Sequence, residues 1–172
     1  MKIAKQIFTI IIFVLFICLL ALLQITIVNR YPIGGVKLNL VLIGLVANLF
    51  NPHFEMIILG AIAGGLIYDF SGLFNFISLF SFILMLVLLR LWSKKYLVKK
   101  NILIIFVFGL IGTVIFNFFY VLMGYFFFHE NFFPYFLSSK QLIEMLLNGS
   151  GALILALVGE GFSQIVHLFK KK

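Results

Sequence analysis

The chain has 172 residues, of which 64% are hydrophobic and 10% are charged, and its formal net charge is +8. Its mean hydropathy is +1.24, whereas a water-soluble domain of this size needs far more polar surface. The composition excludes a soluble globular domain and predicts one polytopic, all-α integral membrane domain over residues 1–172.

The first predicted helix covers residues 6–28 and follows the short basic segment MKIAKQ. Such a start is also typical of a signal peptide. However, the apolar run from Ile7 to Val28 is longer than a signal-peptide core and has no convincing small-residue cleavage site. We expect the helix to be retained, with Cys18 as a small apolar packing residue.

Breaks in the apolar pattern predict about six transmembrane helices. They are expected over residues 6–28, 36–50, 54–69, 73–92, 101–128 and 140–168. Pro52 lies between the second and third, where a proline usually ends one helix or begins the next. The alternative is a single kinked helix across residues 36–69, which gives five spans.

The basic residues predict the topology. With six spans both termini share one side, and ten of the 13 basic residues fall there: Lys2, Lys5, Arg90, Lys94, Lys95, Lys99, Lys100, Lys170, Lys171 and Lys172. Arg30, Lys37 and Lys140 fall on the other side. The positive-inside rule then places both termini in the cytoplasm. We expect contact with anionic membrane lipid and no nucleic-acid binding, because no domain remains to form a basic groove.

Small residues recur on closely spaced turns of the third predicted helix, at Gly60, Gly64 and Gly65. Small residues at such spacing let two helix backbones approach closely in lipid, so this face predicts helix packing or partner binding. Asp69 follows, with Ser71 and Gly72 in the turn. A carboxylate at this depth predicts either a functional contact, to a helix, a partner or an outward cavity, or a cap for the next helix; both can hold.

The last predicted helix carries Glu160, Gln164 and His167 at positions i, i+4 and i+7, which continue an edge made by Ala152 and Ala156. This face is either a polar seam against another helix or partner, or an interfacial helix end.

The fifth predicted helix carries Gly109, Thr113 and Asn117 on one stripe, which indicates packing and interhelical hydrogen bonds. Asn39 and Asn48 receive the same interpretation.

Sequence patterns of catalysis or metal binding are missing from the chain. There is no P-loop, no HExxH and no cysteine-rich metal spacing, and the five acidic residues form no obvious catalytic pair. We therefore expect no enzymatic activity, no catalytic residue, no metal and no cofactor.

The run GAIAGGLIYDFSG at residues 60–72, the length and the six-helix pattern resemble the bacterial rod shape-determining protein MreD. Members of that family carry a glycine-rich helix that ends in Gly-x-x-x-Gly-Leu-x-x-Asp, followed by a small-residue turn. Leu23-Gln24 is also similar to the family's first helix. The chain departs from the family at residues 36–39, where a proline is expected, and at Asn75, where a glycine is common.

The resemblance implies a non-catalytic scaffold subunit of the cell-elongation (rod shape) complex in the bacterial inner membrane. Its implied partners are MreC and, through the complex, the actin-like MreB, RodA and a penicillin-binding protein that synthesise peptidoglycan. The family is similar in architecture to the substrate-binding S components of energy-coupling factor vitamin transporters. An S component is therefore the alternative, although the first helix lacks the Ala-x-x-x-Ala surface that such proteins often use for docking.

Overall fold

The computed structural model describes residues 2–33, 35–71, 76–95, 101–128 and 138–169. The described residues form six α-helices and one short 3-10 helix, with a single isolated bridge pair and no strand. The elements are α1 (Lys2–Thr26), η1 (Val28–Arg30), α2 (Leu40–Ala47), α3 (Phe54–Phe70), α4 (Ile77–Lys95), α5 (Ile102–Phe128) and α7 (Ser139–Phe169). The predicted all-α class is confirmed.

Four of these helices are long and apolar enough to cross a membrane, over Gln6–Val28, Ile77–Lys94, Leu103–Phe127 and Ser139–Gly161. The chain is therefore a multi-pass membrane protein by the length and composition of its helices. The helix α3, with 17 residues, is about 25 Å long at 1.5 Å per residue.

The second helix is shorter than its sequence predicts. Residues 36–50 were expected to be helical, but α2 runs from Leu40 to Ala47, which is eight residues and about 12 Å. Residues 48–53 are non-helical and separate α2 from α3, so the single kinked helix over 36–69 is wrong. The physical reason for the late start is that α2 begins inside the protein, where side chains of other helices bind its first N–H groups.

The helix α2 lies at the centre of the bundle. It contacts α1, α3, α4, α5 and α7, and all residues from Val41 to Val46 are buried. A short helix that is apolar on every side is stable only when other helices surround it. This explains why its sequence resembles a membrane span although it is too short to cross a hydrocarbon core of about 30 Å.

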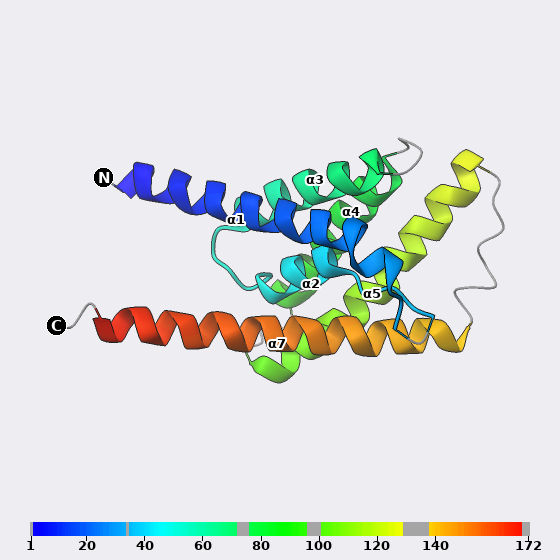
Figure 1. The fold of residues 1–172 in the computed structure, drawn as a ribbon. Helices are drawn as coiled ribbons and strands as arrows, with labels where there is room; N and C mark the ends of the chain where they lie inside the picture. Colours follow the sequence, from blue (N-terminus) through cyan, green and yellow to red (C-terminus); the bar gives the residue numbers. More distant parts are fainter. Residues whose placement is uncertain (1, 34, 72–75, 96–100, 129–137, 170–172) are drawn as a thin grey trace.

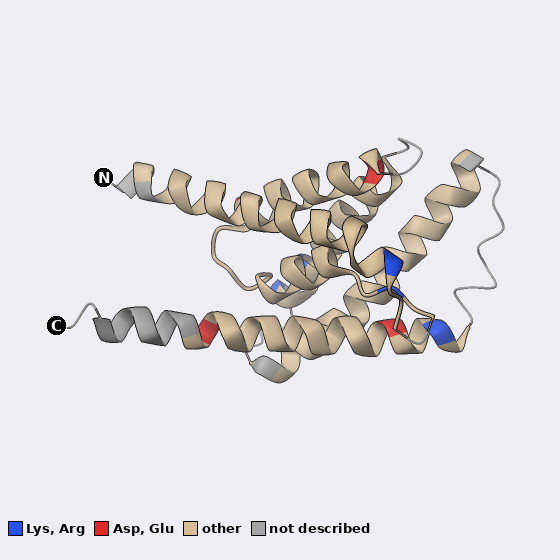
Figure 2. Cartoon of the chain, in the orientation of Figure 1, with Lys and Arg blue, Asp and Glu red and all other residues tan. Residues whose placement is uncertain are grey.

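The longer helices form the outer part of the bundle. α1 packs on α3, α3 on α4, α4 on α5, and α5 on α7. Figure 1 shows α1 and α7 on opposite sides of α2, with both ends of the chain at the same end of the bundle. The outward faces of α1 and α7 expose large apolar side chains, such as Leu15, Leu22, Leu146 and Ile154, and Figure 2 shows long helical stretches without charge. Such surfaces suit a bilayer.

Candidate functional site: the glycine face of α3 and a polar cavity

Two glycines of α3 face other helices of the same chain. A Cβ atom at Gly60 would lie 2.7 Å from Cε1 of Phe13 on α1. At Gly64 it would lie 2.8 Å from Cγ1 of Val41 and 2.9 Å from Cγ2 of Ile17. Any larger residue at either position would overlap these neighbours, so this face is used for packing against α1 and α2.

Gly65 brings the backbones of α3 and α4 together. A Cβ atom here would lie 2.6 Å from Cα of Leu79 and 3.1 Å from its backbone nitrogen. A backbone cannot move aside as a flexible side chain can, so Gly65 tolerates substitution less well than Gly60 or Gly64. All three glycines are buried, and all three lie where α3 packs against other helices of the chain.

Asp69 binds the start of α4 from the end of α3. The residue is 5% exposed. Its Oδ1 accepts a hydrogen bond from the N–H of Ser78 and its Oδ2 accepts one from the N–H of Leu79, each at 3.0 Å. A carboxylate at this position satisfies N–H groups that lack a partner within the helix and complements the helix dipole. The capping interpretation of Asp69 is therefore confirmed.

The residues after Asp69 close α3. Ser71 is exposed, and its hydroxyl donates a hydrogen bond to the carbonyl oxygen of Tyr68 at 2.7 Å. Gly72 lies outside the described residues. In the part of the run that the structure describes, the buried glycines and the capping carboxylate thus hold α3 against α1, α2 and α4.

The start of α2 is held by side chains from three elements. Gln24 of α1 accepts a hydrogen bond from the N–H of Leu40 at 2.7 Å, and Asn148 of α7 accepts one from the N–H of Asn39 at 2.8 Å. The Oδ1 atom of Asn39 accepts a third from the N–H of Leu42 at 3.0 Å. These bonds allow a helix to begin in the apolar interior, where an unsatisfied N–H group is unfavourable.

The polar stripe of α5 makes the interhelical hydrogen bonds that its spacing predicts. Asn148 donates to Oγ1 of Thr113 at 3.2 Å, and Asn117 donates to Oε2 of Glu144 at 3.0 Å. A Cβ atom at Gly109 would lie 2.7 Å from Cα of Gly149, so α5 and α7 also touch through their backbones. The stripe therefore joins α5 to α7, and its packing interpretation is confirmed.

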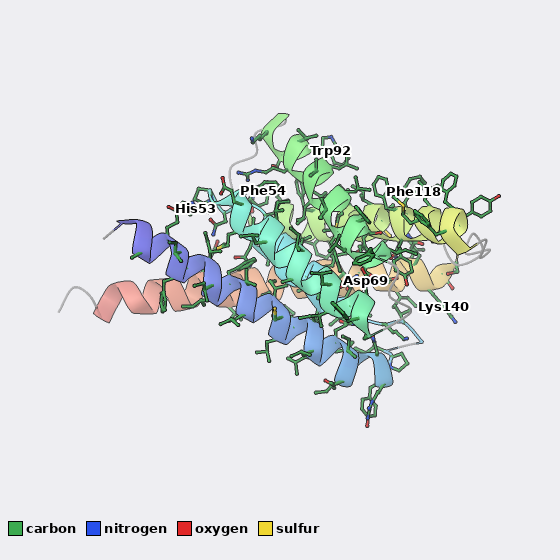
Figure 3. The ribbon with its side chains drawn as sticks, turned by 90° about the horizontal axis from the view of Figure 1, so that it is seen from above. His53, Phe54, Asp69, Trp92, Phe118 and Lys140 are labelled. Carbon is green, nitrogen blue, oxygen red and sulfur yellow. The ribbon has the colours of Figure 1, made fainter. Side chains whose placement is uncertain are left out.

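A cavity of about 440 Å³ lies beside this network. Its walls come from residues 29–39, the end of α3, the middle of α5 and the start of α7: Asn29, Gly35, Lys37, Asn39, Tyr68, Phe116, Asn117, Tyr120, Val121 and Glu144. Glu144 is 7% exposed, whereas Gly35 and Lys37 are exposed and mark the opening. Figure 3 shows Asp69 and Lys140 toward one end of the molecule and His53 and Phe54 toward the other. Gly35, at the opening, lies near Lys140, because a Cβ atom at Gly35 would lie 3.9 Å from Cε of Lys140. The cavity therefore opens at the end of the molecule where Asp69 lies.

The cavity was not predicted from the sequence. Its lining comes from four separate segments, and Asp69, the residue singled out as a candidate for an outward cavity, is not among the lining residues. One sequence signal was present: Gln141, Glu144 and Asn148 lie at i, i+3 and i+7 of α7, and all three are buried. Polar residues at that spacing share one helix face, here the face toward α2 and α5.

A second cavity, of about 620 Å³, lies between α1 and α7 at the opposite end. Glu160 lines it together with Thr9, Asn48 and Asn51. Ala152 and Ala156 are buried, so this edge of α7 faces the bundle. The side chains of Gln164 and His167, which complete the predicted polar face, lie outside the described residues.

Arg90 of α4 binds the backbone just after the end of α2, at the same end of the molecule as the second cavity. Its Nη1 donates to the carbonyl oxygen of Leu49 at 2.9 Å, and its guanidinium lies 5.2 Å from the centre of the Phe54 ring. A cation is favoured beside the last carbonyl groups of a helix. This basic residue, expected only to mark the cytoplasmic side, therefore also connects α4 to the α2–α3 turn.

Within the described ranges, no group of three His, Cys, Asp or Glu residues is placed to hold a metal ion. Comparisons with protein-family models, with curated proteins and with solved structures found no match to the chain. The candidate sites are therefore the glycine face of α3 and the polar cavity beside Glu144.

Proposed function

We propose that the chain is a non-catalytic scaffold subunit of the bacterial cell-elongation complex, in the inner membrane and in contact with MreC. The observation that carries the proposal is the run at residues 60–72, which resembles MreD. Its described residues act together, because the buried glycines and Asp69 hold α3 against three other helices, α1, α2 and α4. Through MreC the complex would include MreB, RodA and a penicillin-binding protein.

The proposed topology has six passes and cytoplasmic termini. Both chain ends lie at the same end of the bundle, which supports an even number of passes (Figure 1). The second pass would combine α2 with the non-helical residues before it, since α2 alone is about 12 Å long. The basic residues Lys2, Lys5 and Lys170–Lys172 would then face the cytoplasm.

A partner helix is not expected to bind at the buried glycines of α3, because other helices of the chain cover them. A partner helix could reach Gly60 only by displacing α1, because Phe13 and Ile17 cover it, and Gly64 only by displacing both α1 and α2, because Ile17 and Val41 cover it. Loss of MreC after a bulky substitution at Gly64 would therefore reflect a damaged fold. A test of the scaffold function has to use the intact chain.

The test is to tag the full chain in a rod-shaped bacterium that depends on it, purify it in mild detergent and identify the proteins that accompany it. We expect MreC in the purified complex and round cells after depletion of the chain. Rod-shaped cells after depletion, together with no MreC in the complex, would contradict the scaffold.

The cavity favours a second candidate function, a solute-binding membrane protein similar to an S component. A volume of about 440 Å³ with several polar groups on an apolar wall is typical of small-molecule sites. Native mass spectrometry of the purified chain tests this candidate, because a solute-binding protein should retain a small molecule in a one-to-one complex. Absence of any bound species, with no binding of added solutes, would exclude it.

A further inference from the structure

We propose that the cavity beside Glu144 binds a compact organic cation, with the ligand's ammonium group against the Glu144 carboxylate and its apolar part against the aromatic wall. This inference rests on the solute-binding candidate and is independent of the scaffold proposal.

Glu144 supplies the charge. Among the described lining residues it is the single carboxylate, and it is 7% exposed. Asn117 donates one hydrogen bond to Oε2, which fixes the orientation of the carboxylate in the wall. A buried carboxylate is attracted to a cation more strongly than an exposed one, because little water screens the pair.

Aromatic side chains form much of the remaining wall. Tyr68, Phe116 and Tyr120 all line the cavity. The rings of Phe116 and Tyr120 are stacked, with centroids 5.8 Å apart, and Phe116 also stacks on Phe82 at 4.5 Å. Aromatic faces attract organic cations, and the attraction is larger at sites from which water is excluded.

One buried acceptor lies near Glu144 on α7, outside the lining of the cavity. Gln141 lies three residues before Glu144 on the same face of α7, and its buried Oε1 atom has no hydrogen-bond partner among the described residues. An ammonium group provides donors and no acceptor. An ammonium group therefore suits the Glu144 carboxylate in the cavity wall better than an acceptor-rich group does.

An anionic ligand is less well accommodated. The start of α2 borders the cavity at Asn39, and a free helix start would favour an anion. However, the N–H groups of Asn39, Leu40 and Leu42 already donate to side-chain oxygens. Lys37, the basic residue in the lining, is exposed at the opening, where solvent and salt screen its charge.

The test uses three probes of nearly the same shape on the full chain in detergent: phenethylamine, 2-phenylethanol and phenylacetate. We expect phenethylamine to bind about tenfold more tightly than the alcohol, and phenylacetate to bind most weakly. Glu144→Gln should remove the preference for the amine. Glu160→Gln, at the other end of the molecule, is the matched control and should keep it.

A second variant guards against misfolding of Glu144→Gln. Tyr120→Leu keeps the carboxylate but removes one aromatic face, and it should weaken phenethylamine more than 2-phenylethanol. Equal or tighter binding of the alcohol or of phenylacetate would overturn the inference.

Native mass spectrometry separates this inference from the function on which it rests. A neutral or anionic molecule that co-purifies with the chain would overturn the organic cation and leave solute binding intact. No co-purified molecule and no binding of any probe would overturn both. A co-purified amine that is lost in Glu144→Gln would support both.

Discussion

The glycine face of α3 and the cavity beside Glu144 both lie between helices, but they differ in how the space between those helices is used. At Gly65 the backbones of α3 and α4 are so close that a Cβ atom would lie 2.6 Å from the neighbouring Cα. Beside Glu144 the helices leave about 440 Å³ open and line it with amide, phenol and carboxylate groups. The first region holds the fold together, whereas the second has the composition of a binding site.

The comparison shows that the most conspicuous sequence pattern need not mark the surface that meets a ligand or partner. The residues at 60–69 are contiguous and easily recognised in the sequence, and their glycines pack against other helices of the same chain. The cavity is assembled from residues as far apart as Asn29 and Glu144. Substitutions at Gly65, Asp69, Asn148 and Thr113 probe the packed region and the polar network separately, and their expected effects decrease in that order.

Replacing Gly65 by leucine should have the largest effect. The new side chain would meet the backbone of Leu79, and the expected loss of folding free energy is about 3 kcal/mol. Thermal unfolding in detergent, followed by loss of the monodisperse peak in size-exclusion chromatography, measures it. Gly159→Leu is the matched control, because nothing lies within 4 Å of a Cβ atom there, and it should behave as the unmodified chain. Equal melting of the two variants would contradict the close approach of α3 and α4.

Replacing Asp69 by alanine should lower stability by about 2 kcal/mol, since the N–H groups of Ser78 and Leu79 lose their acceptors. Asp69→Asn keeps one oxygen acceptor and should fall between alanine and the unmodified chain. The same unfolding assay applies. Glu55→Ala, at an exposed position in the first turn of α3, is the control and should have little effect. An Asp69→Ala protein with unchanged melting would rule out the cap.

Replacing Asn148 by leucine should lower stability by about 1–2 kcal/mol, because the N–H of Asn39 is left without its acceptor in the interior. Amide hydrogen exchange at the start of α2 should become faster in the variant. Ser150→Ala is the control on the same helix, because that hydroxyl donates to Leu146 within its own turn and holds no other helix. Unchanged exchange at Asn39 would show that Asn148 does not hold α2.

Replacing Thr113 by valine should have the smallest effect, about 0.6 kcal/mol, which is the usual size of an interhelical hydrogen bond in a membrane protein. The change preserves shape and removes the oxygen that accepts from Asn148. Thr26→Val is the control, because its hydroxyl donates within α1 and is exposed. A loss of several kcal/mol at Thr113 would mean that the network acts as one unit rather than as separate bonds.

Much of the fold could be predicted because apolar runs of spanning length become helices wherever backbone groups must be satisfied internally. The bounds of α3 and α5 lie within one residue of the predictions, and the α5 stripe at Thr113 and Asn117 forms the expected hydrogen bonds. The cap made by Asp69 was one of two interpretations that the sequence left open.

The short α2 and the cavity could not be predicted, since both depend on contacts between distant residues. Hydropathy does not reveal that Gln24 and Asn148 hold the first N–H groups of α2, which lets this helix begin at Leu40 rather than at residue 36. The cavity likewise depends on how four separate segments meet, and no local pattern around Tyr68 or Asn29 predicts that meeting.

The bond between Asn39 and Asn148 joins positions 109 apart in the chain. During translation α2 is made before α7, so the inner start of α2 lacks this partner until α7 has been synthesised. The start of α2 should therefore become ordered only after α7 has entered the bilayer. A ribosome-bound chain that stops before residue 139 should leave the amide of Asn39 open to exchange.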